Sequence, residues 1–375
     1  MPWKDISLMS QRLEFITMAL KPGTNMTQLC NQYGITRRTG YKWLHRFAEK
    51  DIYGLENQSR RPYHSPSKTP YKMEQTVLDI RENHSCWGGR KIRRRLLDKG
   101  YTSVPAASTI TEILRRHNCL DEKEAIKHTP FKRFEYEKPN QLWQMDFKGY
   151  FSLKSGHCHP LTILDDHSRF SIGIKACANE KQSTVRGHLI YVFRRYGLPD
   201  RFLMDNGPPW GAGGQSRYTK LSVWLIHLGI NVIHSRPYHP QTMGKDERFH
   251  RTLKAEVINN HVFGTIDDAQ KRFDHWRNIY NLERPHEALD MDIPASRYEP
   301  SQRTYPETLP HIEYGPDDQV RKVQEKGEIS FKGKTFKVGK AFIKYPVAVR
   351  TTTKDGIYNV FFCHKKIKQI DLRNP

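Results

Sequence analysis

Cysteine is scarce in this chain, and its six cysteines include no Cys-x-x-Cys pair and no regular spacing. This argues against a disulfide framework and fits a reducing compartment. No apolar run approaches the length of a membrane span, and the amino-terminal residues lack the pattern of a signal peptide. The sequence contains no P-loop motif, so chemistry driven by a nucleoside triphosphate is not indicated. We therefore expect a cytoplasmic protein that has no membrane partner.

Acidic residues are also few: the chain has 40 Asp and Glu but 62 Lys and Arg, which gives a formal net charge of +22. The excess is largest in residues 1–72 and 301–375, which each carry +7. This balance fits a polyanionic partner that both ends of the chain contact. A soluble surface with surplus lysine is the alternative, and charge alone does not separate the two. The length of 375 residues is too great for one compact core, so we expect several domains.

Three carboxylates in the middle of the chain stand in contexts that suit metal-dependent chemistry. Asp146 lies in the apolar run Leu-Trp-Gln-Met-Asp-Phe, which predicts a buried strand. Asp205 ends a second such run just before Asn206-Gly207, as in a strand that delivers an acid to a turn. Glu247 begins a stretch with helical periodicity. The pair Asp165-Asp166 is better explained as part of a turn, where Asp bonds its own backbone, than as metal ligands. If the three acids converge, their repulsion requires a cation, and hard oxygen ligands favour Mg²⁺ or Mn²⁺.

Four ordered sequence blocks around these acids resemble the retroviral-integrase-core superfamily and the transposases of bacterial insertion sequences. The blocks are Trp143-Gln144-Met145-Asp146, Met204-Asp205-Asn206-Gly207, the run from His239 to Phe249 that contains Glu247, and Tyr280-Asn281 with Arg284-Pro285-His286-Glu287-Ala288-Leu289. Together they cover roughly residues 139–300. The resemblance implies an RNase H-like fold and a DDE transposase or integrase.

The same resemblance implies a mechanism. Asp146, Asp205 and Glu247 would be the catalytic acids and the metal ligands, with Asp146 bridging two Mg²⁺ or Mn²⁺ ions and each other acid holding one. Cleavage would free 3′-OH ends at the terminal inverted repeats of a mobile element, and transesterification would join them to target DNA. We expect double-stranded DNA as the partner, a homodimer or higher homo-oligomer on that DNA, and association with the bacterial nucleoid. A DNA-binding regulator with a catalytically silent core and a nuclease that only hydrolyses DNA are the alternatives.

The chain departs from the family pattern in two places. Between Asp205 and Glu247 lie 41 residues, several more than usual, and the Gly-rich loop at 211–216 is the expected place of the insertion. Asp246 stands where an apolar residue is usual. Because neighbouring helix residues point in different directions, we expect Asp246 to lie off the metal-binding face and Glu247 to be the ligand.

Residues 1–55 are predicted to form a domain that resembles a helix-turn-helix DNA-binding domain of the transposase type. They show the periodicity of three helices, with a turn at Gly34-Ile35 and Thr36 as the N-cap of the third. The candidates for reading base edges in the major groove, early in that third helix, are Arg37, Arg38, Tyr41 and Lys42. Gly40 is unusual there, because glycine inside a helix costs about 1 kcal/mol relative to alanine. A small helical domain with a solvated basic face is the alternative.

A basic linker rich in Pro and Ser is predicted at residues 56–72. Arg60 and Arg61 within it fit a minor groove, although a plain spacer explains the segment equally well. Residues 73–138 are predicted to hold a second helical unit and a linker, and they resemble the second helix-turn-helix found before integrase cores. Its candidate phosphate contacts are Arg93, Arg94, Arg95, Arg115 and Arg116.

The predicted catalytic core covers residues 139–300 and combines a mixed sheet with covering helices. Arg251 and Lys254 follow Glu247 by four and seven residues, so we expect them on its face, holding phosphates beside the scissile bond. After a linker at 301–320, short alternating runs and turn pairs in 321–375 predict a small β-barrel that contacts DNA. We therefore expect a multidomain α+β protein with N-terminal helix-turn-helix units, an RNase H-like mixed α/β core and a C-terminal small β-barrel.

Overall fold

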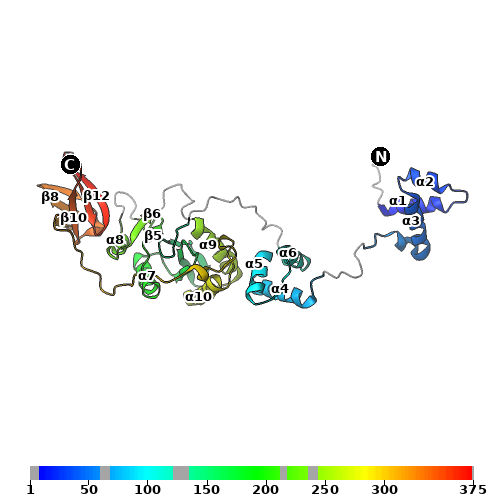
Figure 1. Ribbon diagram of the computed structural model, residues 1–375, viewed down its shortest axis with the longest axis horizontal. Coiled ribbons are helices and arrows are strands. Elements are labelled where there is room, and N and C mark those ends of the chain that lie inside the picture. The colour runs from blue at the N-terminus through cyan, green and yellow to red at the C-terminus, as the bar shows by residue number, and fades with distance from the viewer. Residues whose placement is uncertain (1–7, 60–67, 121–134, 212–217, 235–243, 374–375) are drawn as a thin grey trace. The chain divides into compact units, whose positions relative to one another are not determined.

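The computed structural model describes residues 8–59, 68–120, 135–211, 218–234 and 244–373 (Figure 1). Contacts between residues divide the chain into two compact units, Met1–Lys68 and Thr69–Pro375. Across the described ranges, we find no helix that is both long enough and apolar enough to cross a membrane.

The first unit holds three helices and a final 3-10 turn, as the periodicity predicted. The elements are α1 (Leu8–Ala19), α2 (Met26–Gln32), α3 (Arg37–Lys50) and η1 (Asp51–Leu55). Gly34 adopts φ +62° in the turn between α2 and α3, a backbone conformation that glycine reaches without strain. Thr36 then caps α3, since its side chain accepts a hydrogen bond of 3.3 Å from the Thr39 backbone N–H.

Gly40 has a packing role that helix propensity alone does not indicate. It is buried in α3, where a Cβ would lie 2.7 Å from Cys30 Sγ and 3.0 Å from Phe15 Cζ. Any larger residue would therefore push α3 away from α1 and α2. The close contact among the three helices offsets the propensity cost of this glycine.

The second unit begins with three helices, α4 (Tyr71–Asn83), α5 (Gly89–Asp98) and α6 (Ala107–Arg116). Helix α4 begins within the predicted linker, directly after Pro70. The helices share one apolar cluster that comprises Val77, Ile80, Trp87, Ile92, Leu96, Ile110, Ile113 and Leu114. The four-residue spacing of Ile92 and Leu96 puts both on one face of α5 and leaves the arginines of that helix on the others.

A mixed sheet follows, as predicted for the core. Its strands are β1 (Trp143–Phe147), β2 (Phe151–Leu153), β3 (Gly156–Asp165), β4 (Ser171–Cys177), β5 (Arg201–Met204) and β6 (Asn231–His234). Their order is β2-β3-β1-β5-β6, with β4 paired to β3. Strand β3 runs antiparallel to β1 and β4, whereas β1, β5 and β6 are parallel. Two of the three predicted acids belong to the parallel part of the sheet, since Asp146 lies in β1 and Asp205 directly follows β5.

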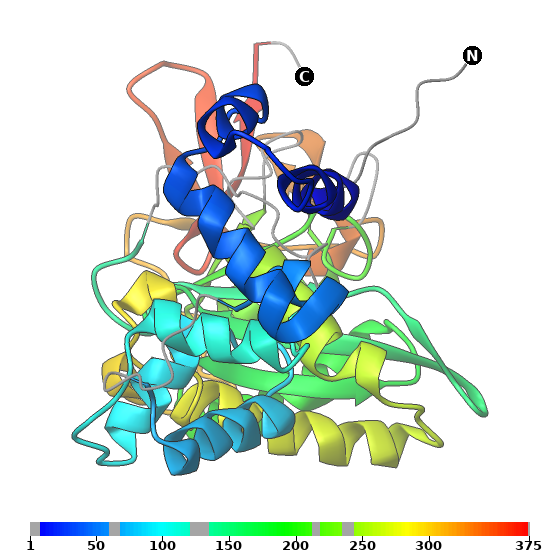
Figure 2. The same ribbon diagram turned by 90° about the vertical axis from the view of Figure 1, so that its right-hand side faces the viewer.

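Helices pack on both faces of this sheet. Ile172 of β4 belongs to one buried cluster and Ile174 to another, although regular alternation would put both on one face. The register of β4 against β3 shifts between Ile163 and Leu164, and this irregularity interrupts the alternation at Ile172. The first cluster includes residues of α7 (Gln182–Tyr196) and α8 (Lys220–His227). The second includes residues of α9 (Gly244–Glu256) and α10 (Ile266–Leu282). Figure 2 shows α9 and α10, in yellow-green and yellow, beside the green strands of the core.

The C-terminal region is rich in β-strands. The strands β7 (Gln319–Lys322), β10 (Pro346–Thr351), β11 (Ile357–Phe362) and β12 (Lys365–Asp371) form one sheet in the order β12-β11-β10-β7. A separate ladder pairs β8 (Glu328–Phe331) with β9 (Lys334–Lys337). Within the described residues neither sheet closes on itself, so the β-rich character is confirmed and the closed barrel stays a prediction.

Candidate active site

Two of the three predicted acids lie side by side at the carboxyl ends of neighbouring parallel strands. Gln144 of β1 pairs with Leu203 of β5, and Asp146 and Asp205 each follow two residues further along their strand. The sequence prediction of a strand around Asp146, and of a strand that ends at Asp205, is therefore confirmed. Carboxyl ends of parallel strands are a common place for a site, because adjacent strands deliver their side chains to one edge.

The carboxyl group of Asp146 is poorly suited to carry a charge in the absence of a cation. Burial, together with the nearby charges of Asp205 and Glu180, raises its pKa to about 7. A hydrogen bond from the Phe147 backbone acts in the opposite direction. A group of acids in this arrangement favours either protons or a positively charged ligand.

Asp246 also lies beside Asp146, contrary to the expectation that it would face away. Its carboxyl group is 1% exposed, and possible ligand atoms of Asp146, Asp246 and His250 lie within 4.8 Å of one another. The buried residues of α9 are Asp246, Phe249 and Leu253, spaced by three and four. Position 246 therefore belongs to the apolar face of the helix, and the acid enters the core there. The sequence contained this signal, because Phe249 and Leu253 mark the buried face.

Glu247 occupies the exposed side of the same helical turn and is not part of this three-residue group. Arg251 and Lys254, one and two turns further on, are exposed as well. The charge of Lys254 also reaches Lys148, whose pKa is lowered by burial and then by Lys254. Lys148 follows Asp146 by two residues, directly after β1, so basic side chains from the end of β1 and from α9 lie near one another beside the acids.

Thr162 and His250 complete the polar cluster around Asp246. The Thr162 hydroxyl lies 2.7 Å from His250 Nε2, 3.3 Å from Asp246 Oδ1 and 3.1 Å from the Asp146 carbonyl oxygen. Burial lowers the pKa of His250 to about 3, with Lys148 adding to the effect, so its imidazole is neutral at pH 7. Burial also raises the pKa of Asp246 well above its usual range, with Asp146 adding to the effect. One side chain on β3 thus joins the strand of Asp146 to the helix of Glu247.

Asp165 and Asp166 are structural residues of the β3–β4 turn, which confirms the assignment to turn chemistry. Asp165 Oδ2 accepts hydrogen bonds from the backbone N–H and the hydroxyl of Ser168, at 2.8 and 2.6 Å. Asp166 Oδ2 lies 2.5 Å from Lys245 Nζ in a buried ion pair. This pair fixes the first turn of α9 to the turn between the strands, and Glu247 follows two residues later.

The candidate base-reading residues Arg37, Arg38, Tyr41 and Lys42 are exposed on the first half of α3. Their exposure leaves them accessible to DNA, and the assignment stays a prediction. Arg60 and Arg61 lie outside the described residues.

The arginines of the second helical unit are mostly engaged by carboxylates, which the sequence did not indicate. Three of them on α5 pair with acids of the core, and these pairs are Arg90–Glu287, Arg94–Asp292 and Arg95–Glu283. On α6, Arg115 pairs with Glu112, and Arg116 pairs with Glu74 of α4. Arg93 is exposed. Phosphate contact by the paired arginines would require them to leave these acids.

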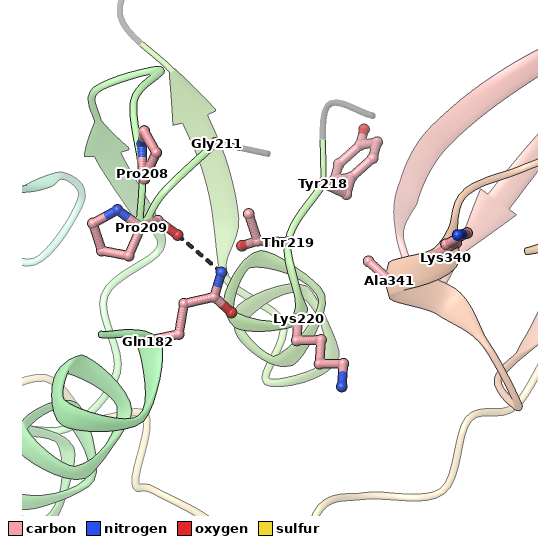
Figure 3. Close-up of a pocket in the computed structure, with 9 residues that line it drawn as sticks. All are labelled: Gln182, Pro208, Pro209, Gly211, Tyr218, Thr219, Lys220, Lys340 and Ala341. Atoms are coloured by element: carbon pink, nitrogen blue, oxygen red, sulfur yellow. Dashed lines mark hydrogen bonds between the residues drawn. The ribbon is translucent and has the colours of Figure 1, made fainter. Parts of the chain in front are cut away.

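A pocket of about 560 Å³ is lined in part by the segment that follows Asp205 (Figure 3). Its lining comes from the first residue of α7, the segment after Asp205, the beginning of α8 with the two residues before it, and the 3-10 helix η7 (Lys340–Phe342). Gln182 Nε2 donates a hydrogen bond of 3.2 Å to the Pro209 carbonyl across one side, as the dashed line in Figure 3 marks. Lys220 and Lys340 make the lining basic.

Parts of the chain match known domain families. Residues 136–240 and 228–294 match integrase core domains, and residues 318–375 match the C-terminal domain of IS481 family transposases. Residues 11–63 match a helix-turn-helix domain, and residues 39–114 match a homeodomain-like domain.

Curated relatives include proteins of insertion elements and of retroviruses. An uncharacterized 39.2 kDa protein of insertion element IS476 from Xanthomonas euvesicatoria is 27% identical over 259 residues, which is 68% of this chain and 72% of that protein. A 31.7 kDa protein of insertion element IS407 from Burkholderia multivorans is 26% identical over 157 residues, 42% of this chain and 54% of that protein. The Gag-Pol polyprotein of baboon endogenous virus is 25% identical over 275 residues, 72% of this chain, but the match spans only 15% of the polyprotein.

Among solved structures, an intasome of simian T-cell lymphotropic virus in complex with PP2A regulatory subunit B56 gamma resembles the chain. The match has a TM-score of 0.40 and 15% sequence identity, and it covers 79% of this chain and 96% of that one.

Proposed function

We propose that this chain, a DDE transposase with helix-turn-helix domains, an integrase core and an IS481-family C-terminal domain, cuts and joins DNA at the ends of a mobile element. It would bind the terminal inverted repeats, cut to free 3′-OH ends and join those ends to target DNA. The observation that carries this proposal is the placement of Asp146 and Asp205 side by side at the ends of β1 and β5. Two acids at that edge, on a fold with an integrase core, suit transesterification, in which the DNA phosphate passes from one oxygen to another.

The residues present fit divalent cations. Asp146 is largely buried beside Asp205, and a cation would relieve both the burial of charge and the mutual repulsion. We assign Asp146, Asp205 and Glu247 as catalytic acids and as ligands of two Mg²⁺ or Mn²⁺ ions. Bound there, such ions would supply charge stabilisation to the attacking oxygen, the phosphate and the leaving oxygen.

The chain itself would hold the DNA end against these acids. Arg251 and Lys254 are exposed on α9 one and two turns beyond Glu247, and Lys148 directly follows β1, the strand of Asp146. This basic rim would bind the phosphates that flank the scissile bond and orient the bond toward Asp146 and Asp205. Without covalent attachment to the protein, correct placement of the reacting oxygens becomes the main task of the site.

Recognition of the ends is assigned to the helical units. Arg37, Arg38, Tyr41 and Lys42 would read base edges in the major groove, and Arg60 and Arg61 would follow the minor groove. Further phosphate contacts are assigned to Arg93, Arg94, Arg115 and Arg116. The units would keep the proposed boundaries, with residues 139–300 as the catalytic core and 321–375 as a small β-barrel on DNA. A homodimer or higher homo-oligomer would hold the two ends together on the bacterial nucleoid.

The test incubates purified protein with candidate element ends, Mg²⁺ and a target plasmid, followed by sequencing of the junctions. Asp146→Asn, Asp205→Asn and Glu247→Gln should each abolish cleavage and joining, while gel shifts show nearly unchanged end binding. The reason is that metal ligation and end recognition belong to different domains. Turnover by any of the three variants would refute the assignment of that acid. Cleavage without joining would instead indicate a hydrolytic nuclease, and specific binding without cleavage would indicate a regulator.

A further inference from the structure

Asp246 is a buried acid with one carboxyl oxygen that no hydrogen bond among the described residues satisfies. Its side chain is 1% exposed, and Oδ1 accepts a hydrogen bond of 3.3 Å from the Thr162 hydroxyl. For Oδ2, no hydrogen-bond partner exists among the described residues. Buried carboxylates in folded proteins are normally paired or coordinate metals, because removing a charge from water is costly. A position where an apolar side chain would suffice therefore carries an acid with one free oxygen.

His250 faces the same oxygen without neutralising it. His250 Nε2 lies 3.5 Å from Asp246 Oδ2, which is too long for a hydrogen bond. The same nitrogen lies 2.7 Å from the Thr162 hydroxyl. That hydroxyl also reaches the Asp146 carbonyl at 3.1 Å, so it keeps an acceptor if the imidazole turns toward another ligand.

Asp146, on strand β1 beside the β3 strand of Thr162, is the third member of the group. Its carboxylate, the Asp246 carboxylate and an imidazole nitrogen of His250 all have possible ligand atoms within 4.8 Å of one another. Two carboxylates at this separation repel each other, and the imidazole nitrogen of His250 is a third ligand type within the same 4.8 Å. A divalent cation satisfies all three at once. Oxygen ligands alone suit Mg²⁺, but an added imidazole shifts the preference toward Mn²⁺ and related transition metals.

We propose that Asp146, Asp246 and His250 form a binding site for a divalent transition-metal cation of the Mn²⁺ class, a site to which Glu247 does not belong. This inference rests on the proposed function, because Asp146 would be a ligand of this cation and also one of the catalytic acids. A cation there would fix β1 to α9, and so would hold the exposed face of α9, with Glu247, Arg251 and Lys254, at a constant position relative to Asp146. Asp246 and His250 thereby act as positioning residues.

The test uses the full chain without DNA and measures the bound metal rather than turnover. Pulsed EPR on protein loaded with Mn²⁺ detects coupling to an imidazole nitrogen, and Mn²⁺ titration gives the affinity. The wild-type chain should show this coupling. Asp246→Asn and His250→Gln should lose it and weaken Mn²⁺ binding at the site by about tenfold or more. Glu247→Gln is the matched control, because it removes a charge one residue away and should keep the nitrogen coupling.

The outcomes separate the two proposals. Absence of nitrogen coupling in the wild-type chain, or coupling that persists in His250→Gln, would overturn the metal site whatever the activity. If Asp246→Asn does not fold, as judged by circular dichroism, His250→Gln decides alone, because it leaves both acids in place. Loss of cleavage in Glu247→Gln with nitrogen coupling retained would support both proposals. Full cleavage by Glu247→Gln would refute only the assignment of the third catalytic acid.

Discussion

Removing three acids from the core should release three arginines of α5 from the core and make them available to DNA, with Arg94 keeping its pair with Asp98 of the same helix. The pairs that hold them are Arg90–Glu287, at 2.6 Å, Arg94–Asp292, at 2.9 Å, and Arg95–Glu283. Their side chains are between 21% and 71% exposed, so each pair is worth about 0.2–1 kcal/mol and is screened by salt. The three together stabilise the docked helix by at most about 3 kcal/mol, an amount that a dense row of phosphates can replace.

The predicted effect of Glu283→Gln/Glu287→Gln/Asp292→Asn is tighter DNA binding with a steeper dependence on salt. Each arginine that reaches a phosphate adds about 0.9 to the slope of log K against log salt, so the slope should steepen by as much as about 2.7. Fluorescence anisotropy with a labelled duplex across a range of salt concentrations measures both quantities.

A control variant separates release of the arginines from simple loss of negative charge. Asp274→Asn/Glu299→Gln/Asp317→Asn removes the same charge from exposed acids elsewhere in the second unit. It should tighten binding slightly through the net charge. Equal slopes for the two triple variants would refute the reasoning, and would mean that α5 stays on the core when DNA binds.

Three further perturbations have definite expected results. Lys254→Glu should reduce 3′-end cleavage and joining without unfolding the core, because it reverses the charge of the rim beside Asp146; cleavage at the parental rate would place Lys254 on an ordinary solvated surface. Gly40→Ala should destabilise the first unit by about 1–3 kcal/mol in thermal unfolding, because the new Cβ would meet Cys30 Sγ at 2.7 Å; an unchanged midpoint would show that the helices can move apart freely. In protein freed of metal with a chelator, the pKa of Asp146 is about 7 in the folded state and about 4 in the unfolded state. The contribution of Asp146 to the free energy of unfolding is therefore fully present at low pH and declines as the pH rises from about 4 to 7. Asp146→Asn should remove that decline in urea unfolding curves, and an identical pH profile would contradict the buried environment of this acid.

Features that depend on neighbours in sequence were predictable. The apolar runs before Asp146 and Asp205 formed strands, and Thr36 capped the helix that it precedes. Asp165 satisfied backbone groups of its own turn. In each case the interaction spans three residues or fewer, or follows the two-residue alternation of a strand, so the sequence contains it directly.

Features that depend on distant partners were not predictable. Arg95 and Glu283 are 188 residues apart, and nothing local marks either as half of a pair. The need for glycine at position 40 arises from Cys30 on another helix. Asp246 is a different case, because the spacing of Phe249 and Leu253 already marked its face as buried. The expectation that it would point away followed from the assumed direction of Glu247 instead of from that apolar pattern.

Helix α9 is therefore the element on which metal and DNA would meet. Its buried face carries Asp246 and His250 toward Asp146, while its exposed face carries Glu247 and the basic residues that follow. Because the helix is rigid, any contact that sets the rotation of one face also sets the other. The ion pair of Lys245 with Asp166 and the bonds of Thr162 both act on the first two turns, next to Glu247. An acid at position 246 thus costs stability where an apolar residue would suffice. It also gives the buried face of α9 a ligand for a cation, and that cation would fix the alignment of the exposed face of the same helix.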